Sequence, residues 1–199
     1  FSQPGSYLLQ LTVGDSELWA SDTMTVTVDP LPSQPSASTT AVFQQGHGGY
    51  QGTSDTYLRS TSENRASGDR SVMTFDGVPD SAALIRWDLS TLPVGSQVTS
   101  ASVTLNVVNP SRQDYSIYEL LQDWSETHAT WNQAADGALW QASGAQGDQD
   151  SASISLGTVS PDSVGKLTVS LNAEGVAVVQ AWIDNPTGNH GLMIQRYDV

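Results

Sequence analysis

The segment densest in chemically useful side chains is "DWSETHATWN", positions 123–132, which holds two carboxylates, a histidine, two tryptophans and an asparagine. Asp123 and Glu126 match the composition of a glycosidase pair, which needs two carboxyl groups roughly 5 to 10 Å apart around one glycosidic bond. Asp-x-x-Glu is also the form of a capping box, whose side chains bond the free amides that begin a helical turn. The spacing favours the capping box, so we interpret Trp124 and Trp131 as flanking a structural turn, where they either close an edge of the fold or stack on a sugar.

No other segment offers a catalytic or zinc motif. His47, His128 and His190 lie in separate segments without the short spacing of a zinc site. The absence of cysteine excludes disulfides, thiolate metal sites and a cysteine nucleophile. There is no Gly-x-Ser-x-Gly elbow, and "GHGG" at 46–49 lacks the Lys-Ser/Thr of a phosphate-binding loop. The sequence therefore predicts a protein that is not an enzyme.

Two aspartate clusters are the candidate metal ligands. Asp76 and Asp80 belong to "DGVPD", and Asp148 and Asp150 belong to "GDQD". Calcium needs six to eight oxygen ligands, and neither cluster is the twelve-residue loop of an EF-hand. These aspartates either contribute to a structural calcium site or form turns.

The charge balance excludes two classes of partner. The chain has 21 acidic against 7 basic residues, a net charge of -14, whereas binding to nucleic acid or to an anionic membrane relies on a basic patch. No apolar run approaches the roughly 18 residues that span a bilayer. The polar, cysteine-free composition is typical of secreted bacterial β modules, so we expect an extracellular protein. Because the chain begins at Phe1 in mid-pattern, we also expect an upstream portion that carries any export signal.

Three regions divide the chain. Segments 7–13 and 23–28, rich in β-branched residues, predict a hairpin within residues 1–29. Residues 4–29 resemble the last two strands of a PKD or similar immunoglobulin-like repeat. Residues 30–40 are rich in proline and serine, which predicts an extended linker. Residues 41–199 form the main domain.

The main domain has the pattern of an antiparallel β-sandwich of jelly-roll type. Short apolar runs separated by Gly, Pro, Asn and Asp predict strands within 55–60, 81–89, 97–108, 115–121, 151–159, 166–172 and 190–199. One stretch has helical spacing instead, and it predicts a short helix near residues 173–185. Asn172 is placed to cap its start, and Pro186-Thr187-Gly188 is placed to end it.

Four phrases resemble the DNRLRE domain, which is grouped with carbohydrate-binding module family 96. They are "FQQGHGGYQGTSDTYLRS" (43–60), "ALIRWDLSTLPVGSQVTSASVTLNV" (83–107), "DWSETHATWN" (123–132) and "AWIDNPTGNHGLMIQ" (181–195). The resemblance implies a β-sandwich accessory module of a secreted multidomain protein, with alginate as the expected class of ligand.

Sugar binding uses aromatic faces and forked hydrogen-bond donors. Tyr57 and Arg59 alternate onto one face of the strand at 55–60. We predict that Arg86 shares this face, so that the two arginines hold a uronate carboxylate together. The alternative for each is an internal salt bridge, to Asp55 or Asp88. Trp140 and Tyr50 lie in glycine-rich loops, and we predict that they are exposed for sugar stacking, unless they act as lids over the core.

These observations predict a non-catalytic, extracellular polysaccharide-binding module that keeps attached upstream domains of the same polypeptide near their substrate. A uronate-containing glycan such as alginate is the expected ligand, although the net charge leaves a neutral glycan open. The alternative is a structural module of a fibre or surface layer, in which the N-terminal hairpin self-associates with a neighbouring subunit.

Overall fold

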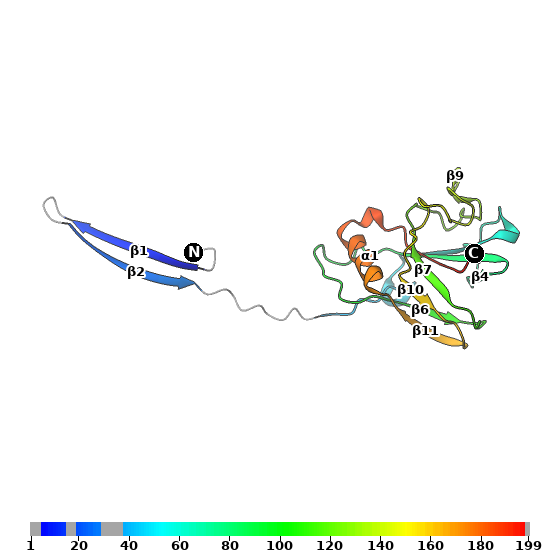
Figure 1. The fold of residues 1–199 in the computed structure, drawn as a ribbon, viewed down its shortest axis with the longest axis horizontal. Coiled ribbons are helices and arrows are strands. Elements are labelled where there is room, and N and C mark those ends of the chain that lie inside the picture. Colours follow the sequence, from blue (N-terminus) through cyan, green and yellow to red (C-terminus); the bar gives the residue numbers. More distant parts are fainter. Residues whose placement is uncertain (1–4, 15–18, 29–37, 198–199) are drawn as a thin grey trace. The chain divides into compact units, whose positions relative to one another are not determined.

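The computed structural model describes residues 5–14, 19–28 and 38–197 (Figure 1). Contacts divide the chain into two units, Phe1–Ala41 and Val42–Val199. Most of the predicted linker, residues 29–37, lies outside the described residues, and residues 38–40 are exposed and have no regular structure.

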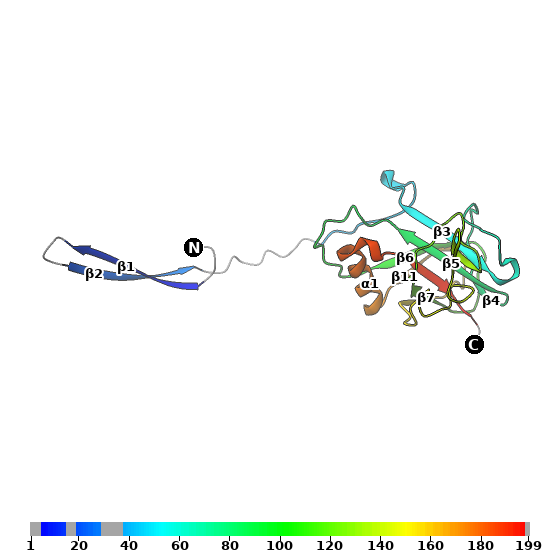
Figure 2. The same cartoon turned by 90° about the horizontal axis from the view of Figure 1, so that it is seen from above.

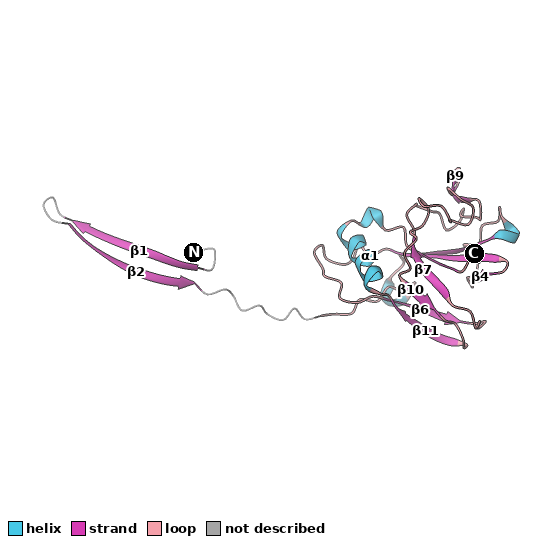
Figure 3. Cartoon of the chain, in the orientation of Figure 1, coloured by secondary structure: helices cyan, strands magenta, loops and turns pink. Residues whose placement is uncertain are grey.

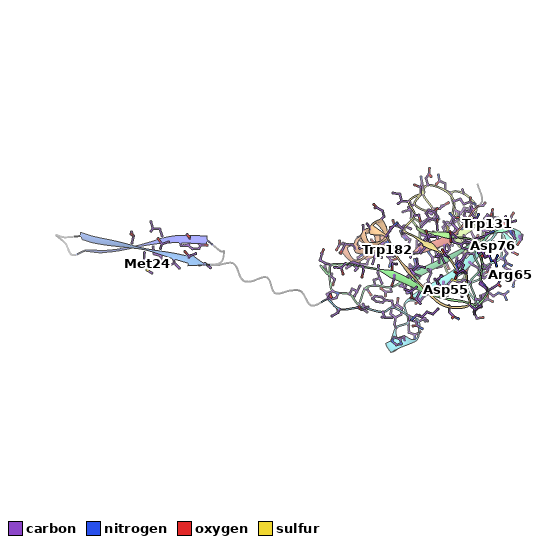
Figure 4. All side chains as sticks on the ribbon, turned by 60° about the horizontal axis from the view of Figure 1, so that its bottom comes forward. Met24, Asp55, Arg65, Asp76, Trp131 and Trp182 are labelled. Carbon is purple, nitrogen blue, oxygen red and sulfur yellow. The ribbon has the colours of Figure 1, made fainter. Side chains whose placement is uncertain are left out.

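The first unit contains the predicted hairpin. Strands β1 (Gly5–Gly14) and β2 (Trp19–Val28) pair antiparallel over their full length. Residues 15–18 lie outside the described residues. Leu9 pairs with Met24, which is labelled in Figure 4, and these two side chains are 40% and 60% exposed on one face of the hairpin. The PKD-like origin of this hairpin stays a prediction.

The second unit is an antiparallel β-sandwich, as predicted. Its larger sheet has the strand order β10-β7-β12-β5-β3, with β4 pairing the start of β5. A second sheet pairs β6 with β11, and a small ribbon pairs β8 with β9. The bounds are β3 (Thr53–Arg59), β4 (Asp76–Gly77), β5 (Asp80–Trp87), β6 (Ser102–Val107), β7 (Tyr115–Glu119), β8 (Gln133–Ala135), β9 (Ala138–Leu139), β10 (Gly157–Val159), β11 (Gly165–Ser170) and β12 (Leu192–Gln195).

The first core lies between the two sheets. Ile85, Ile117 and Ile194 point from the larger sheet toward Val103 of β6 and Val169 of β11, and all five are buried. This is the usual packing of a sandwich, in which alternate residues of each strand fill the space between the sheets.

A second core covers the opposite face of the larger sheet. Leu84 and Met193 of that face pack with Trp124, Trp131 and Trp140, which come from the irregular segment 121–151. The central strand β5 is therefore buried on both faces, which explains the continuous apolar run "AALI" in place of strict alternation.

The predicted helix is α1 (Ala173–Asp184), which Figures 1 and 2 show at one end of the unit. The Oδ1 atom of Asn172 accepts a hydrogen bond from the Gly175 N–H at 2.9 Å, as expected of an N-cap. Trp182 is buried in the first core, and its Nε1–H donates to Glu119 Oε1 at 3.1 Å. A 3₁₀ turn, Pro186–Gly188, follows the helix, and two further 3₁₀ turns span His47–Gly49 and Ser60–Ser62 (Figure 3).

Candidate functional site

Three of the side chains singled out in the sequence form a row on β3. Asp55, Tyr57 and Arg59 lie on one face of this strand, opposite Ile85, Ala83 and Ser81 of β5. We call these three residues the edge row, because β3 is the last strand of the larger sheet and pairs only with β5 within the described residues. All three are partly exposed, and Asp55 is labelled in Figure 4.

The edge row is an organised arrangement. The Arg59 Cζ atom lies 5.5 Å from the centroid of the Tyr57 ring, within the range of a cation–π contact. In the described part of the chain Arg59 forms no ion pair. Burial of the Asp55 carboxyl raises its pKa above 3.8, because the charged form loses hydration. The row thus combines an unneutralised planar cation, an aromatic ring and a carboxylate.

Arg86 does not join this row, and the predicted arginine pair is wrong in its geometry. Arg86 pairs with Ser54 while Arg59 pairs with Ser81, which places the two arginines on opposite faces of the sheet. Arg86 Nη1 instead bonds Asp123 Oδ1 at 2.5 Å. The internal salt bridge considered for Arg86 therefore exists, with Asp123 rather than Asp88 as its partner.

The "DWSETHATWN" segment is structural, but the capping box is wrong in its details. The Arg86 guanidinium lies 5.3 Å from the Trp124 ring centroid, and His190 Nδ1 lies 3.9 Å from Asp123 Oδ1. The turn begins two residues after Asp123, since the His128 and Ala129 N–H groups both donate to the Ser125 carbonyl. Trp124 and Trp131 are buried, which confirms that they close the fold, and His128 is exposed.

The two loop aromatics have different outcomes. Trp140 is 5% exposed, and its Nε1–H donates to the Thr130 carbonyl at 2.9 Å, so the prediction of an exposed tryptophan is wrong. The loop folds back over the sheet and buries this ring in the second core, so Trp140 has the alternative role, a lid over the core. Tyr50 is partly exposed, with its hydroxyl donating to the Asp88 carbonyl at 3.1 Å. Burial raises the pKa of this hydroxyl.

No three of the four predicted calcium ligands, Asp76, Asp80, Asp148 and Asp150, lie together in the described part of the chain, and calcium binding stays a prediction. Asp150 is fully buried, and its two carboxylate oxygens accept hydrogen bonds from the N–H groups of Gln141, Ala142 and Gly147 at 2.8, 2.9 and 2.9 Å. Asp76 accepts a bond from the Gly77 N–H at 2.8 Å, and Asp148 is exposed. Within the described residues, no group of three or more His, Asp or Glu is close enough to hold a metal ion. Asp76 and Asp150 have the other predicted role, since their carboxylates accept hydrogen bonds from backbone N–H groups of turns.

A cleft of about 480 Å³ lies on the same face of the sheet as the second core. We call it the β7–β12 cleft. Ser116 and Tyr118 of β7 and Met193 and Gln195 of β12 contribute to its lining. The remaining lining residues are Asp114, Gln146, Asp148, Ser151, Ala152, Ser153, Arg196 and Tyr197.

Comparison of the sequence with models of known protein families found a match. The model of carbohydrate-binding module family 96 matches residues 49–149, just over half of the chain. The protein belongs to carbohydrate-binding module family 96. A search of curated proteins found no match. Within this family 96 module, the matched residues include the whole edge row and the β7 side of the cleft.

The sequence did not indicate the cleft of this family 96 module, because its lining residues come from segments far apart in the chain. The available signal was the alternation in "YSIYE", which separates Ser116 and Tyr118 from the buried Tyr115 and Ile117. That pattern identifies an open face of β7. It does not identify β12 as the neighbouring strand.

Proposed function

We propose that this family 96 module is a non-catalytic, extracellular polysaccharide-binding module that contacts a uronate-containing glycan at the edge row. The observation that supports the proposal is the Arg59 guanidinium, which is stacked over Tyr57 and forms no ion pair in the described part of the chain. Arg86, by contrast, is neutralised by Asp123.

The chemistry of the edge row suits a uronate. A guanidinium offers two parallel N–H donors that match a carboxylate, and stacking on an aromatic ring orients its plane. Because Tyr57 already restricts the Arg59 side chain, less conformational entropy is lost on binding. Asp55 lies four residues from Arg59, about 13 Å along the strand, and its carboxylate accepts hydrogen bonds from sugar hydroxyls. An extended glycan chain can therefore contact both ends of the row. The net charge of -14 opposes a polyanion, and Arg59 supplies the local attraction.

Such a site is weak alone, and the module works by multivalency. Several weak contacts along one polymer raise the retention of a multidomain protein far above that of a single site. The proposed role is therefore to keep attached domains near a polysaccharide outside the cell. None of the helices in the described part of the chain is long and apolar enough to cross a membrane.

The test is calorimetric titration of the 199-residue chain with oligouronates. Because a charge-assisted hydrogen bond contributes about 1.5 to 3 kcal/mol, Arg59→Ala should weaken binding roughly 10-fold to 100-fold. Arg59→Lys keeps the charge and loses the fork, so it should bind with intermediate affinity. Arg65→Ala is the matched control, since Arg65 is exposed and also lacks an ion pair among the described residues. Unchanged affinity in Arg59→Ala would overturn the assignment of the edge row.

One observation favours assembly as a second candidate function. Leu9 and Met24 are exposed on one face of the N-terminal hairpin, and an isolated two-stranded hairpin is marginally stable. Contact with a second copy would cover this face. Sedimentation of the whole chain decides the question: a concentration-dependent oligomer that Met24→Glu dissociates supports assembly, and a monomer at all concentrations excludes it.

A further inference from the structure

We propose that the β7–β12 cleft is a second carbohydrate site and that it accepts a neutral sugar. Its volume of about 480 Å³ is within the range of 300 to 1,000 Å³ that is typical of small-molecule sites. It lies on the opposite face of the sheet from the edge row, because Tyr118 pairs with Met193 and Met193 with Leu84, whereas Tyr57 pairs with Ala83. The inference therefore does not rest on the function proposed for the edge row.

The two amides of the cleft are fixed in complementary orientations. Gln195 Oε1 accepts a hydrogen bond from the Tyr197 N–H at 2.6 Å, which leaves its Nε2 group to donate. Gln146 Nε2 donates to the Ser143 carbonyl at 2.9 Å, which leaves its Oε1 atom to accept. A sugar hydroxyl both donates and accepts, so this pair of groups matches it.

The charges of the cleft favour a neutral ligand over a uronate. Among the described residues that line it are two carboxylates, Asp114 and Asp148, and one cation, Arg196. Carboxylates accept strong hydrogen bonds from hydroxyl groups, whereas a uronate carboxylate would meet two like charges in a protein of net charge -14. Tyr118, which is partly exposed on the floor, offers an aromatic face for the apolar side of a sugar ring.

The wall of the cleft is preformed. The buried Asp150 carboxylate holds three backbone N–H groups of the segment 141–147. The Tyr197 hydroxyl donates to the Gly144 carbonyl at 2.7 Å, and the Ser151 hydroxyl donates to the Ala145 carbonyl at 2.8 Å. Burial raises the pKa of the Tyr197 hydroxyl, which keeps it protonated as a donor. A wall fixed in this way loses little entropy when a ligand binds.

The test is a titration of the 199-residue chain with two sets of probes. The first set contains neutral oligosaccharides of glucose, mannose, galactose and xylose, and the second contains oligouronates. We expect at least one neutral oligosaccharide to bind, and we expect Tyr118→Ala to weaken that binding about 10-fold, as the loss of a stacking ring and its contacts predicts.

Gln195→Glu is the more selective variant. Glutamate keeps the oxygen that accepts the Tyr197 N–H, and it replaces the Nε2 donor with a negative charge. Gln51→Glu is its matched control, because Gln51 Oε1 also accepts a hydrogen bond, from Gln45 Nε2 at 2.8 Å, and lies outside the cleft. We expect Gln195→Glu to weaken binding of the neutral sugar about 10-fold and Gln51→Glu to leave it unchanged.

The proposals for the cleft and for the edge row can be refuted independently of each other. If no neutral oligosaccharide binds, or if both cleft variants bind it as tightly as the parent chain, the cleft proposal is overturned. A uronate that is lost in Arg59→Ala and retained in Gln195→Glu would still support the edge row. If Arg59→Ala abolishes binding of a neutral sugar, that sugar binds at the edge row, and the cleft proposal is also overturned.

Discussion

Asp150 should contribute strongly to the stability of the second unit. Its fully buried carboxylate accepts three backbone hydrogen bonds between 2.8 and 2.9 Å. A hydrogen bond to a charged group contributes about 1.5 to 3 kcal/mol to stability. When the carboxylate is removed, the three backbone N–H groups can bond water instead, which offsets part of the lost free energy. Asp150→Ala should therefore lower the free energy of unfolding by about 3 to 6 kcal/mol. Asp150→Asn retains an acceptor but turns an NH₂ group toward a backbone donor, so its loss should be about half as large.

Urea unfolding followed by tryptophan fluorescence measures this loss, because the segment that Asp150 holds is adjacent to the buried Trp131 and Trp140. The matched control is Asp148→Asn, an exposed aspartate of the same loop, which should change stability by less than about 0.5 kcal/mol. A loss below about 1 kcal/mol for Asp150→Ala would refute the reasoning, since a carboxylate with three buried bonds cannot be so dispensable.

Two further predictions concern pH and metal. Burial raises the pKa of Asp55, so the protonated form is favoured in the folded state; this contribution to stability is present below pH 3.8 and is lost as pH rises through the folded pKa. Asp55→Asn should therefore stabilise the protein at pH 7 and have no such effect at pH 3, and equal effects at both pH values in urea unfolding would contradict this cause. Because no three of the four predicted calcium ligands lie together in the described residues, we expect a chelator to leave the thermal midpoint unchanged, and a fall that added calcium reverses would show that a calcium site exists.

The elements of the main domain could be predicted from the sequence because their signals are local. Each of the seven predicted strand segments overlaps a strand, and the helix begins directly after the predicted cap, Asn172. The alternation of β3 also identified Tyr57 and Arg59 correctly as neighbours on one face. The two-residue strands β4 and β9 carry too little periodicity to be found this way.

The relation between strands could not be predicted in the same way. Alternation tells which residues of one strand share a face, but a shift of one residue in the pairing exchanges the faces of its neighbour. For this reason the sequence predicts Arg59 and Arg86 on one face, whereas the structure places them on opposite faces of the sheet. The prediction that Trp140 is exposed fails for a related reason. Glycine-rich composition indicates a loop, but it does not indicate that the loop crosses a sheet face and buries its tryptophan there.

Both proposed binding sites follow from the way the larger sheet is covered. The second sheet covers one face and the segment 121–151 covers the other, and side chains under these layers are buried and apolar. The edge row, on β3, and the cleft, on β7 and β12, consist largely of polar and aromatic side chains that remain at least partly exposed on opposite faces of this sheet. Substitutions in these exposed parts, such as Arg59→Ala or Gln195→Glu, should change binding with little loss of stability. Substitutions under the covering layers, such as Trp140→Ala, should reduce stability by about 3 to 5 kcal/mol, because they leave a cavity in the second core.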